Sequence, residues 1–325
     1  DESADMYESY RNYCNYLQEV IANTDLSQEA RDHARMLYNN KKQQVLKDVT
    51  NRSGEKRSIV ADAPEATVLY KKKKTNSLDQ ALSYVPPPAI YPSDASISET
   101  VTSISGIWPP TRLRRWSEFL NNVTSFAFDE EPNKHEKPKF TKGLKIRVEP
   151  DVDAITSVNI YHNLNTLMGP RYEFSKQKNS DFKSGDPNIG KGIPDSTCRV
   201  FRNDDGNIII PIEIKRNLVV ESLINDEELA LENTHTRDAV KQIYNYMISL
   251  HLQYGVLSSY DYHWFLCRPK ANPTELLISE ALPLESTSPT VLKSYAYLAY
   301  LAARDPTSPH PNTIPDRTRS VRQAI

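Results

Sequence analysis

The uneven distribution of proline restricts most strongly how this 325-residue chain can fold. Proline removes a backbone hydrogen-bond donor and interrupts helices and central strands, so segments rich in it cannot be regular structure. The 22 prolines, set against only 9 glycines, divide the chain into three parts. We predict a helical hairpin and Pro/Ser-rich linker arm over residues 1–110, a domain over residues 111–305 and a flexible tail over residues 306–325.

The predicted arm carries two helices and a basic run. Apolar residues recur every three or four positions between residues 5 and 23, which indicates an amphipathic helix, and a second helix is predicted over residues 27–47. Residues 50–110 are then rich in Ser, Thr and Pro, with an unbroken run at Lys71–Lys74. Such a run is usually solvated chain, and less often a nuclear-import or phosphate-contacting signal. We expect the helices to bind a protein partner.

Charge and cysteine content exclude several classes of protein. The chain has 40 Lys and Arg against 42 Asp and Glu, so a nucleic-acid site must be a local basic patch. No run approaches the roughly 18 apolar residues of a membrane span, so we expect no membrane partner. The 3 scattered cysteines form no disulfide framework or zinc spacing, which favours a reducing, intracellular compartment. Because the chain begins at Asp1 rather than Met, we expect a processed piece.

Residues 111–305 alternate between helix-like and strand-like patterns, which predicts an α/β fold. The predicted elements are a short helix near residues 112–120, a helix over 151–167 with Asp151 as its N-cap, strands over 197–202 and 208–215 joined by a short turn, a helix over 234–252 that closes at Gly255, strand-like residues over 256–267 and a buried helix over 289–303. From residue 151 to residue 267 the order is therefore helix, strand, strand, helix, strand.

The predicted strand over residues 208–215 carries two charges among apolar residues. Side chains alternate along a strand, so Glu213 and Lys215 project from the same face. A buried carboxylate is costly unless it is paired or binds metal, and Asp195 brings a second carboxylate to the same end of the neighbouring strand. Two carboxylates with waters and phosphate oxygens suit Mg²⁺. The alternative is an exposed ion pair on an edge strand, which Pro211 favours because proline is rare in central strands.

These residues resemble the signature of a known enzyme superfamily. Pro194-Asp195 followed by Glu213-Ile214-Lys215 resembles the motif of the PD-(D/E)xK phosphodiesterases, and the helical stretch from Gln242 to Tyr246 is similar to the QxxxY element of RecB-type nucleases. The resemblance covers about residues 142–268. A further likeness, to the modules of fungal and oomycete Crinkler-type effectors and kinase-linked nucleases, rests on residues 254–257 leading to residues 263–266.

The resemblance implies a restriction-endonuclease-like αβββαβ core, with an N-terminal helical arm and additional helices. It also implies hydrolysis of DNA or RNA by water activated by Mg²⁺ (or Mn²⁺), and action inside a host cell if the chain is an effector. A nuclear location is predicted from the Lys71–Lys74 run and the nucleic-acid substrate. Asp195, Glu213 and the Ile214 carbonyl would hold the ion, and Lys215 would orient or polarise the water. The remaining implied site residues are the helical pair Gln242 and Tyr246, one first-helix acid from Glu149 and Asp153, and the phosphate-contacting Arg199 and Arg216.

Two other interpretations stay open. The same fold with an inactive site would bind nucleic acid or a protein partner, or the arm would dominate and make the chain a scaffold for assembly. The charges at residues 195, 213 and 215 favour catalysis, because a site that has lost its activity has no physical reason to keep charged residues on a buried strand. The seven histidines show no HExxH or HxH pairing, and no phosphate-binding GxxxxGK[ST] run or Ser or Cys nucleophile motif is present. The choice between DNA and RNA stays open.

Overall fold

The computed structural model describes residue 35 and residues 76–93, 109–128, 135–176, 193–202, 205–224, 229 and 231–311. The chain divides into two units, residues 1–74 and 75–325, and the second unit holds nearly all of the described residues. Apart from residue 35, which is helical, the predicted helical hairpin and the Lys71–Lys74 run lie outside the described residues. Within the ranges given above, no helix has the length and apolar character that crossing a membrane requires.

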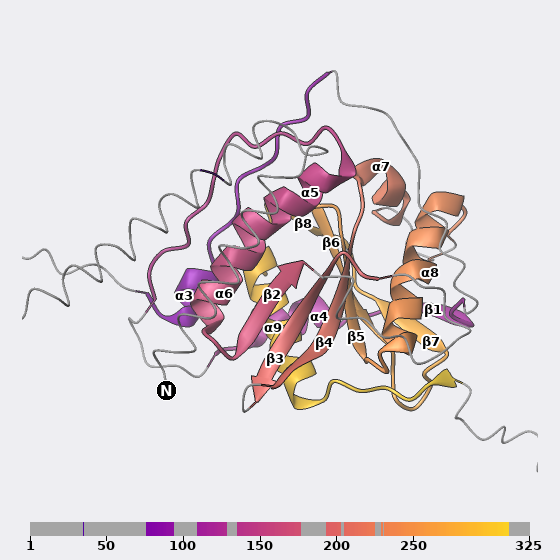
Figure 1. The fold of residues 1–325 in the computed structure, drawn as a ribbon. Coiled ribbons are helices and arrows are strands. Elements are labelled where there is room, and N and C mark those ends of the chain that lie inside the picture. Colours follow the sequence, from indigo (N-terminus) through magenta and orange to yellow (C-terminus); the bar gives the residue numbers. More distant parts are fainter. Residues whose placement is uncertain are drawn as a thin grey trace, which may run out of the picture. The chain divides into compact units, whose positions relative to one another are not determined.

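The second unit is built on a mixed sheet of eight strands in its described part (Figure 1). The strands are β1 (Arg112–Arg115), β2 (Tyr172–Lys176), β3 (Ser196–Arg202), β4 (Asp205–Ile214), β5 (Tyr254–Ser258), β6 (Tyr262–Cys267), β7 (Glu275–Ile278) and β8 (Leu282–Pro283). Their order across the sheet is β1-β7-β6-β5-β4-β3-β2, and β8 pairs with β6. The pairs β1–β7 and β4–β5 are parallel, and the other pairs are antiparallel.

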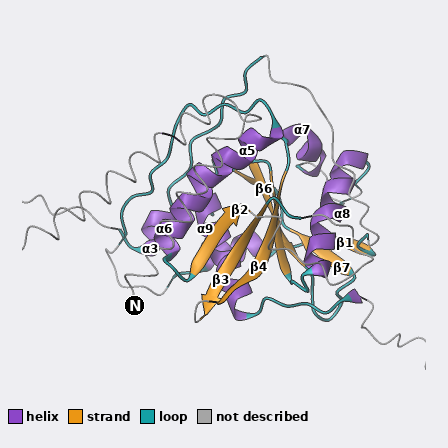
Figure 2. Cartoon of the chain, in the orientation of Figure 1, coloured by secondary structure: helices purple, strands orange, loops and turns teal. Residues whose placement is uncertain are grey.

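Helices cover both faces of this sheet (Figure 2). They are α3 (Leu78–Leu82), α4 (Phe119–Ser125), α5 (Glu149–Thr156), a π turn (Ser157–Tyr161), α6 (His162–Met168), α7 (Asn217–Val220), a 3₁₀ turn (Glu221–Leu223), α8 (Thr234–Ser249) and α9 (Val291–Arg304). One hydrophobic cluster, which we call the α9 cluster, joins the sheet to α3, α4, α5, α6 and α9. A second, the α8 cluster, joins it to α7 and α8. The predicted α/β class is confirmed.

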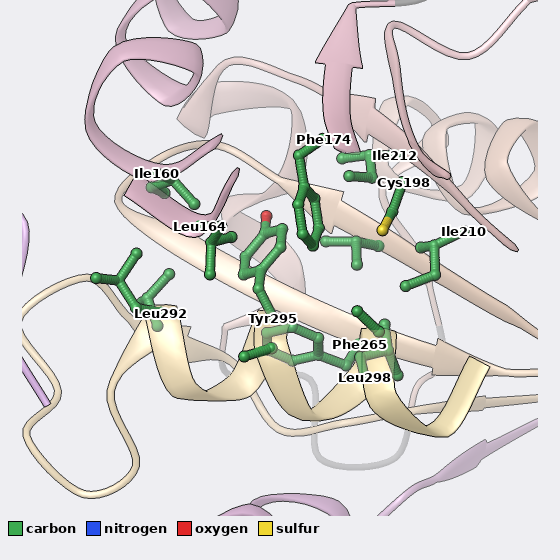
Figure 3. Packing of buried hydrophobic residues seen from close by; sticks show 14 of the residues in the cluster. Ile160, Leu164, Phe174, Cys198, Ile210, Ile212, Phe265, Leu292, Tyr295 and Leu298 are labelled. Carbon is green, nitrogen blue, oxygen red and sulfur yellow. The ribbon is translucent and has the colours of Figure 1, made fainter. Parts of the chain in front are cut away.

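Alternation along the central strands sends successive side chains into the two clusters. Ile212 and Ile214 of β4 belong to the α9 cluster, whereas Leu257 of β5, which pairs with Glu213, belongs to the α8 cluster. Tyr295 of α9 points into the first cluster, where its ring meets Phe174 and Phe265 (Figure 3). Glu213 therefore faces the α8 side of the sheet, and its neighbours Ile212 and Ile214 pack on the α9 side.

The order of elements around β4 is close to the prediction. The helical segment α5–α6, the strands β3 and β4, helix α8 and strand β5 all form where their patterns predicted them. The structure adds β2 before β3, so the order becomes helix, three strands, helix, strand, with α7 and a 3₁₀ turn before α8. Asp151 is not the N-cap of the first helix, because its side chain accepts hydrogen bonds from the backbone N–H groups of Arg147 and Val148 from within the first turn.

Three predicted boundaries differ from the structure. Residues 112–115 form edge strand β1 rather than a helix, because they pair with β7 while Leu113 packs on the α8 cluster. Residues 76–93, predicted as arm, belong to the second unit, where α3 is buried in the core and the Leu82 carbonyl accepts from Thr290 Oγ1. Helix α8 ends at Ser249, and Gly255 lies in β5, where an added Cβ would sit 2.9 Å from Met247 Sδ. This glycine permits close helix-to-sheet contact.

The first residues of the predicted tail are held by a buried arginine. Arg268, which follows β6, is 0% exposed and donates to four backbone carbonyls. Two of them, of Met247 and Leu252, lie at the end of α8, and the other two, of Ser308 and Pro309, lie beyond α9. Burial lowers the pKa of this guanidinium to about 10. Residues 306–311 are therefore part of the folded unit.

We predict that Arg268→Met lowers the free energy of unfolding by about 2–5 kcal/mol, because the methionine fills the space but removes four hydrogen bonds to backbone carbonyls. Urea unfolding measures the change. The control is Lys270→Met, which removes an exposed ammonium that forms an ion pair with the surface carboxylate of Asp305. This variant should change the free energy of unfolding by less than about 0.5 kcal/mol. Equal effects of the two variants would contradict a stabilising role for Arg268.

Candidate functional site

The two charges of β4 are buried at the carboxyl end of a central strand. Glu213 is 1% exposed and Lys215, directly after the strand, is 4% exposed. The Lys215 ammonium forms an ion pair with Glu213 Oε1 and lies 3.8 Å from Glu149 Oε1. The alternative of an exposed pair on an edge strand is wrong, because β3 and β5 flank β4 on its two sides. The strand accommodates Pro211 because pairing with β5 begins one residue later, at Ile212.

Asp195 joins these charges from the start of β3. Its Oδ2 accepts a 2.7 Å hydrogen bond from the backbone N–H of Ile214, which lies between Glu213 and Lys215. This bond crosses the β3–β4 pair at the end where Ser196 faces Ile212. The predicted meeting of two carboxylates and one ammonium at one end of β4 is therefore present in the structure.

The charges at this end of β4 shift one another's proton affinity. Burial raises the pKa of Glu213 well above its ordinary value, and Asp195 adds to this against the opposing charge of Lys215. Burial likewise raises the pKa of Asp195 to about 6, although Lys215 and the Ile214 N–H lower it. Burial alone would lower the pKa of Lys215, but the surrounding carboxylates, Glu149 among them, outweigh it and raise that pKa. The ammonium is therefore held in its charged form.

The first helix supplies both of the predicted acids, at different places. Glu149 begins α5 and faces Lys215, and α5 and α7 start close together at this end of the sheet (Figure 1). Asp153 lies one turn further along, where Oδ1 accepts from Ser196 Oγ at 3.3 Å and Oδ2 lies 3.1 Å from Lys176 Nζ. Of the two open alternatives, the structure places Glu149 against the lysine and Asp153 against the start of β3.

Helix α8 presents Gln242 and Tyr246 to the sheet. Both side chains are buried, and Gln242 Nε2 donates to the Tyr246 hydroxyl at 2.9 Å. Burial raises the pKa of Tyr246 above its ordinary value, and the charge of Glu213 adds to this, so the hydroxyl keeps its proton. In the described part of the chain, Glu213 Oε2 and Gln242 Oε1 are buried acceptors without a hydrogen-bond partner. Such atoms are uncommon in folded proteins and mark a place where a donor or cation fits.

The two arginines that were predicted to contact phosphate lie at different places in the structure. Arg216 is the N-cap of α7, directly after Lys215, and its charge lowers the pKa of Glu149 against the larger raising effect of burial. Arg199 lies four residues along β3 from Asp195, roughly 13 Å away in an extended strand, and donates to the Gly206 carbonyl at 3.3 Å. The structure therefore brings Arg216, and not Arg199, to the carboxylates.

Sequence reasoning missed a group beside Arg216. The Tyr91 hydroxyl and Asn217 Nδ2 both donate to Asp261 Oδ2. Tyr91 and Asn217 are 126 positions apart, and Asn217 and Asp261 are 44 apart, so no local spacing connects them. The only signal available was the position of Asn217, two residues after the lysine of the motif.

The donor set allows a test of whether a divalent ion fits. In the described ranges no group of three or more His, Cys, Asp or Glu side chains is arranged to hold an ion by itself. Two carboxylates, those of Asp195 and Glu213, do share one end of β4, and one of their oxygens lacks a partner. This set fits an ion such as Mg²⁺ that retains waters and takes phosphate oxygens to complete its shell.

Comparison with known proteins gives no match. No family model matches the chain, and neither a curated protein nor a solved structure is significantly similar to it. The interpretation of the site therefore rests on the arrangement of its own residues.

We predict that Asp195→Asn stabilises the protein in EDTA at neutral pH. The folded-state pKa of about 6 exceeds the unfolded value of about 3.9, so the folded state binds the proton more tightly. As the pH rises from about 4 to about 6, the free energy of unfolding of the wild type falls by up to roughly 3 kcal/mol relative to that of the variant. The difference persists above that range. Urea unfolding at acidic and neutral pH measures it.

The matched control for this pH effect is Glu280→Gln, which changes an exposed carboxylate. It should alter stability by less than about 0.5 kcal/mol at either pH. A variant at residue 195 that is no more stable than the wild type at neutral pH would show that the carboxylate is not held at an unfavourable site.

Proposed function

We propose that the second unit is a metal-dependent nuclease of the PD-(D/E)xK type, which hydrolyses phosphodiester bonds of DNA or RNA. The observation that supports this most directly is the convergence of Asp195, Glu213 and Lys215 at one buried end of β4. The order of helix, three strands, helix and strand from α5 to β5 agrees with the core that the resemblance implies. The likeness to Crinkler-type effectors and a location in the nucleus stay predictions.

The residues that would hold the ion are Asp195, Glu213 and the Ile214 carbonyl. The unpartnered Glu213 Oε2 gives such an ion a buried anionic ligand, and Asp195 keeps a second carboxylate oxygen after accepting the Ile214 N–H. A bound divalent ion supplies a nucleophilic water at neutral pH and offsets charge that develops on phosphate.

Lys215 has two tasks in this proposal. Its ion pair with Glu213 and its approach to Glu149 fix the ammonium at the end of β4, so its charge is in place before substrate binds. Because its pKa is raised, the group stays an ammonium and donates hydrogen bonds, and does not act as a base near neutral pH. It therefore orients a water or a phosphate oxygen and stabilises negative charge.

Other residues shape the surroundings of the reacting phosphate. The Tyr246 hydroxyl retains its proton and is held by Gln242, so this pair contributes an ordered polar edge on the α8 side. Arg216 adds a cation on the α7 side, next in sequence to Lys215. Lys215 and Arg216 thus place two cations beside the carboxylates of Asp195, Glu213 and Glu149, and a bound divalent ion would add the further positive charge that a phosphate requires.

The alternative is a nuclease-fold module without catalytic activity that binds nucleic acid or a protein. One observation favours it, since the Lys215 ammonium already neutralises Glu213, and in the described part of the chain no third acid completes a set of metal-binding side chains. Ion binding and cleavage distinguish the two functions.

We predict that Mg²⁺ or Mn²⁺ stabilises the wild type and not Asp195→Ala. Binding to the folded state alone adds about 2.7 kcal/mol at a hundredfold excess of ion over Kd. Titration calorimetry and thermal unfolding with increasing ion measure this without substrate. Asp305→Ala, which removes a surface carboxylate, is the control and should retain the full effect. Ion binding that survives Asp195→Ala would place the ion elsewhere.

We also predict metal-dependent cleavage of nucleic acid. Supercoiled plasmid, linear duplex, single-stranded DNA and RNA are incubated with Mg²⁺, Mn²⁺ or EDTA. Asp195→Ala and Lys215→Ala should each lower the rate at least about 100-fold, because each removes charge stabilisation from the reacting phosphate. Lys139→Ala, which removes an exposed lysine that pairs with Glu136, should keep the wild-type rate.

Two outcomes would contradict the proposed nuclease activity at this site. No cleavage of any substrate by folded wild type that binds the ion would favour the inactive module. Cleavage that persists in both variants would point to a contaminating nuclease or to a different site.

A further inference from the structure

Three large hydrophobic residues are exposed in the described ranges, and they lie in two segments that the Tyr91–Asn217 contact brings next to each other. They are Ile90, Tyr91 and Leu218, at 45%, 47% and 40% exposure, and we call them the Tyr91 surface. Ile90 and Tyr91 are consecutive, and Leu218 follows Asn217, whose Nδ2 lies 3.2 Å from the Tyr91 hydroxyl. Exposed apolar groups that cluster in one place mark an interaction site more often than groups scattered singly.

The aromatic ring of this surface is fixed although it is exposed. The Tyr91 hydroxyl donates to Asp261 Oδ2, and Asn217 donates to the same oxygen. The backbone before the ring is held on both sides, because the N–H of Ile90 donates to the Leu144 carbonyl and its carbonyl accepts from the N–H of Ile146, each at 2.9 Å. A ring held at its hydroxyl and at its backbone loses little conformational entropy when a ligand packs on it.

The Tyr91 surface adjoins the cationic side of the candidate site. Asn217 and Leu218 begin α7, directly after Lys215 and Arg216 at the end of β4. Arg216 is close enough to lower the pKa of Tyr91, against the larger raising effects of burial and Asp261. An aromatic ring, an apolar side chain and the Arg216 cation therefore follow one another along this edge, and the buried Lys215 directly precedes Arg216 in sequence. A nucleotide has the matching chemistry, with a flat base next to an anionic phosphate.

We propose that the Tyr91 surface stacks a nucleobase of a single-stranded nucleic acid whose neighbouring phosphate lies at Arg216. The inference rests on the proposed function and specifies its substrate class. Inside a duplex each base face is already covered by its neighbours, so a fixed ring beside the phosphate selects an unpaired base. A strand bound in this way gains affinity from its bases as well as from its charge.

The test separates base stacking from phosphate attraction. Fluorescence anisotropy measures binding of a labelled single-stranded oligonucleotide, as DNA and as RNA, and of a matched strand with the same phosphates but abasic sugars. The measurements are made in EDTA and again with Ca²⁺, so they do not depend on turnover. Tyr91→Ala removes the ring, Tyr91→Phe keeps it, and Tyr300→Ala is the control, since it changes a tyrosine of α9 that packs on Phe126.

We expect the wild type to bind the base-bearing strand roughly 5- to 150-fold more tightly than the abasic strand. Tyr91→Ala should remove this preference, whereas Tyr91→Phe and Tyr300→Ala should retain it. Equal affinity for the two strands, or a preference that survives Tyr91→Ala, overturns the proposal, and so does folded wild type that binds neither strand. If Tyr91→Ala unfolds, Leu218→Ala is read instead, with a loss of preference of about two- to fivefold expected.

Failure of this inference is distinguishable from failure of the proposed function. Metal-dependent cleavage together with equal affinity for both strands retains the nuclease and removes the stacking surface. Base-dependent binding without cleavage retains the stacking surface and favours the inactive module.

Discussion

The burial of Glu213 beside Lys215 is the constraint on which the rest of this domain depends. Neither charge would be tolerated alone on a central strand, and each supports the other only because both lie at the strand's end. Asp195 and Glu149 then approach from β3 and α5, which ties three separate elements to one point. The hydrophobic clusters on the two faces of the sheet pack around this buried point.

The two faces of the sheet are packed differently around these charges. Behind them, the α9 cluster packs aliphatic and aromatic side chains, and the buried His263 Nδ1 contacts the hydroxyls of Ser258 and Tyr295 there. On the α8 side, Gly255 lets the helix approach β5 closely, and Gln242 and Tyr246 are buried between helix and sheet, where the charge of Glu213 adds to the effect of burial in raising the pKa of Tyr246. Arg268 secures the far end of the same helix. Close packing and polar contacts thus act together to orient α8.

Local spacing predicted the centre of the site and little of its surroundings. Glu213 and Lys215 lie two residues apart on a strand, and Gln242 and Tyr246 lie four apart on a helix, so periodicity alone places each pair. Tyr91 is joined to its partners only by folding, so the sequence placed it in a linker. Residues 112–115 were predicted to be helical because their pairing with β7, far along the chain, is invisible to local patterns. The α/β class followed from the alternation of elements.

The π turn between α5 and α6 determines the direction in which the side chains of α6 point relative to those of α5. A π turn adds one residue to a helix, and each residue of a regular helix rotates the next side chain by about 100°. Val152 and Ile155 lie before the turn and Leu164 lies after it, and all three belong to the α9 cluster. Without the extra residue, every side chain after the turn would be rotated by about 100° relative to those before it, and Leu164 would leave the face on which Val152 and Ile155 pack. The extra residue at 157–161 therefore works as a rotational spacer that keeps one apolar face continuous along the whole helical segment.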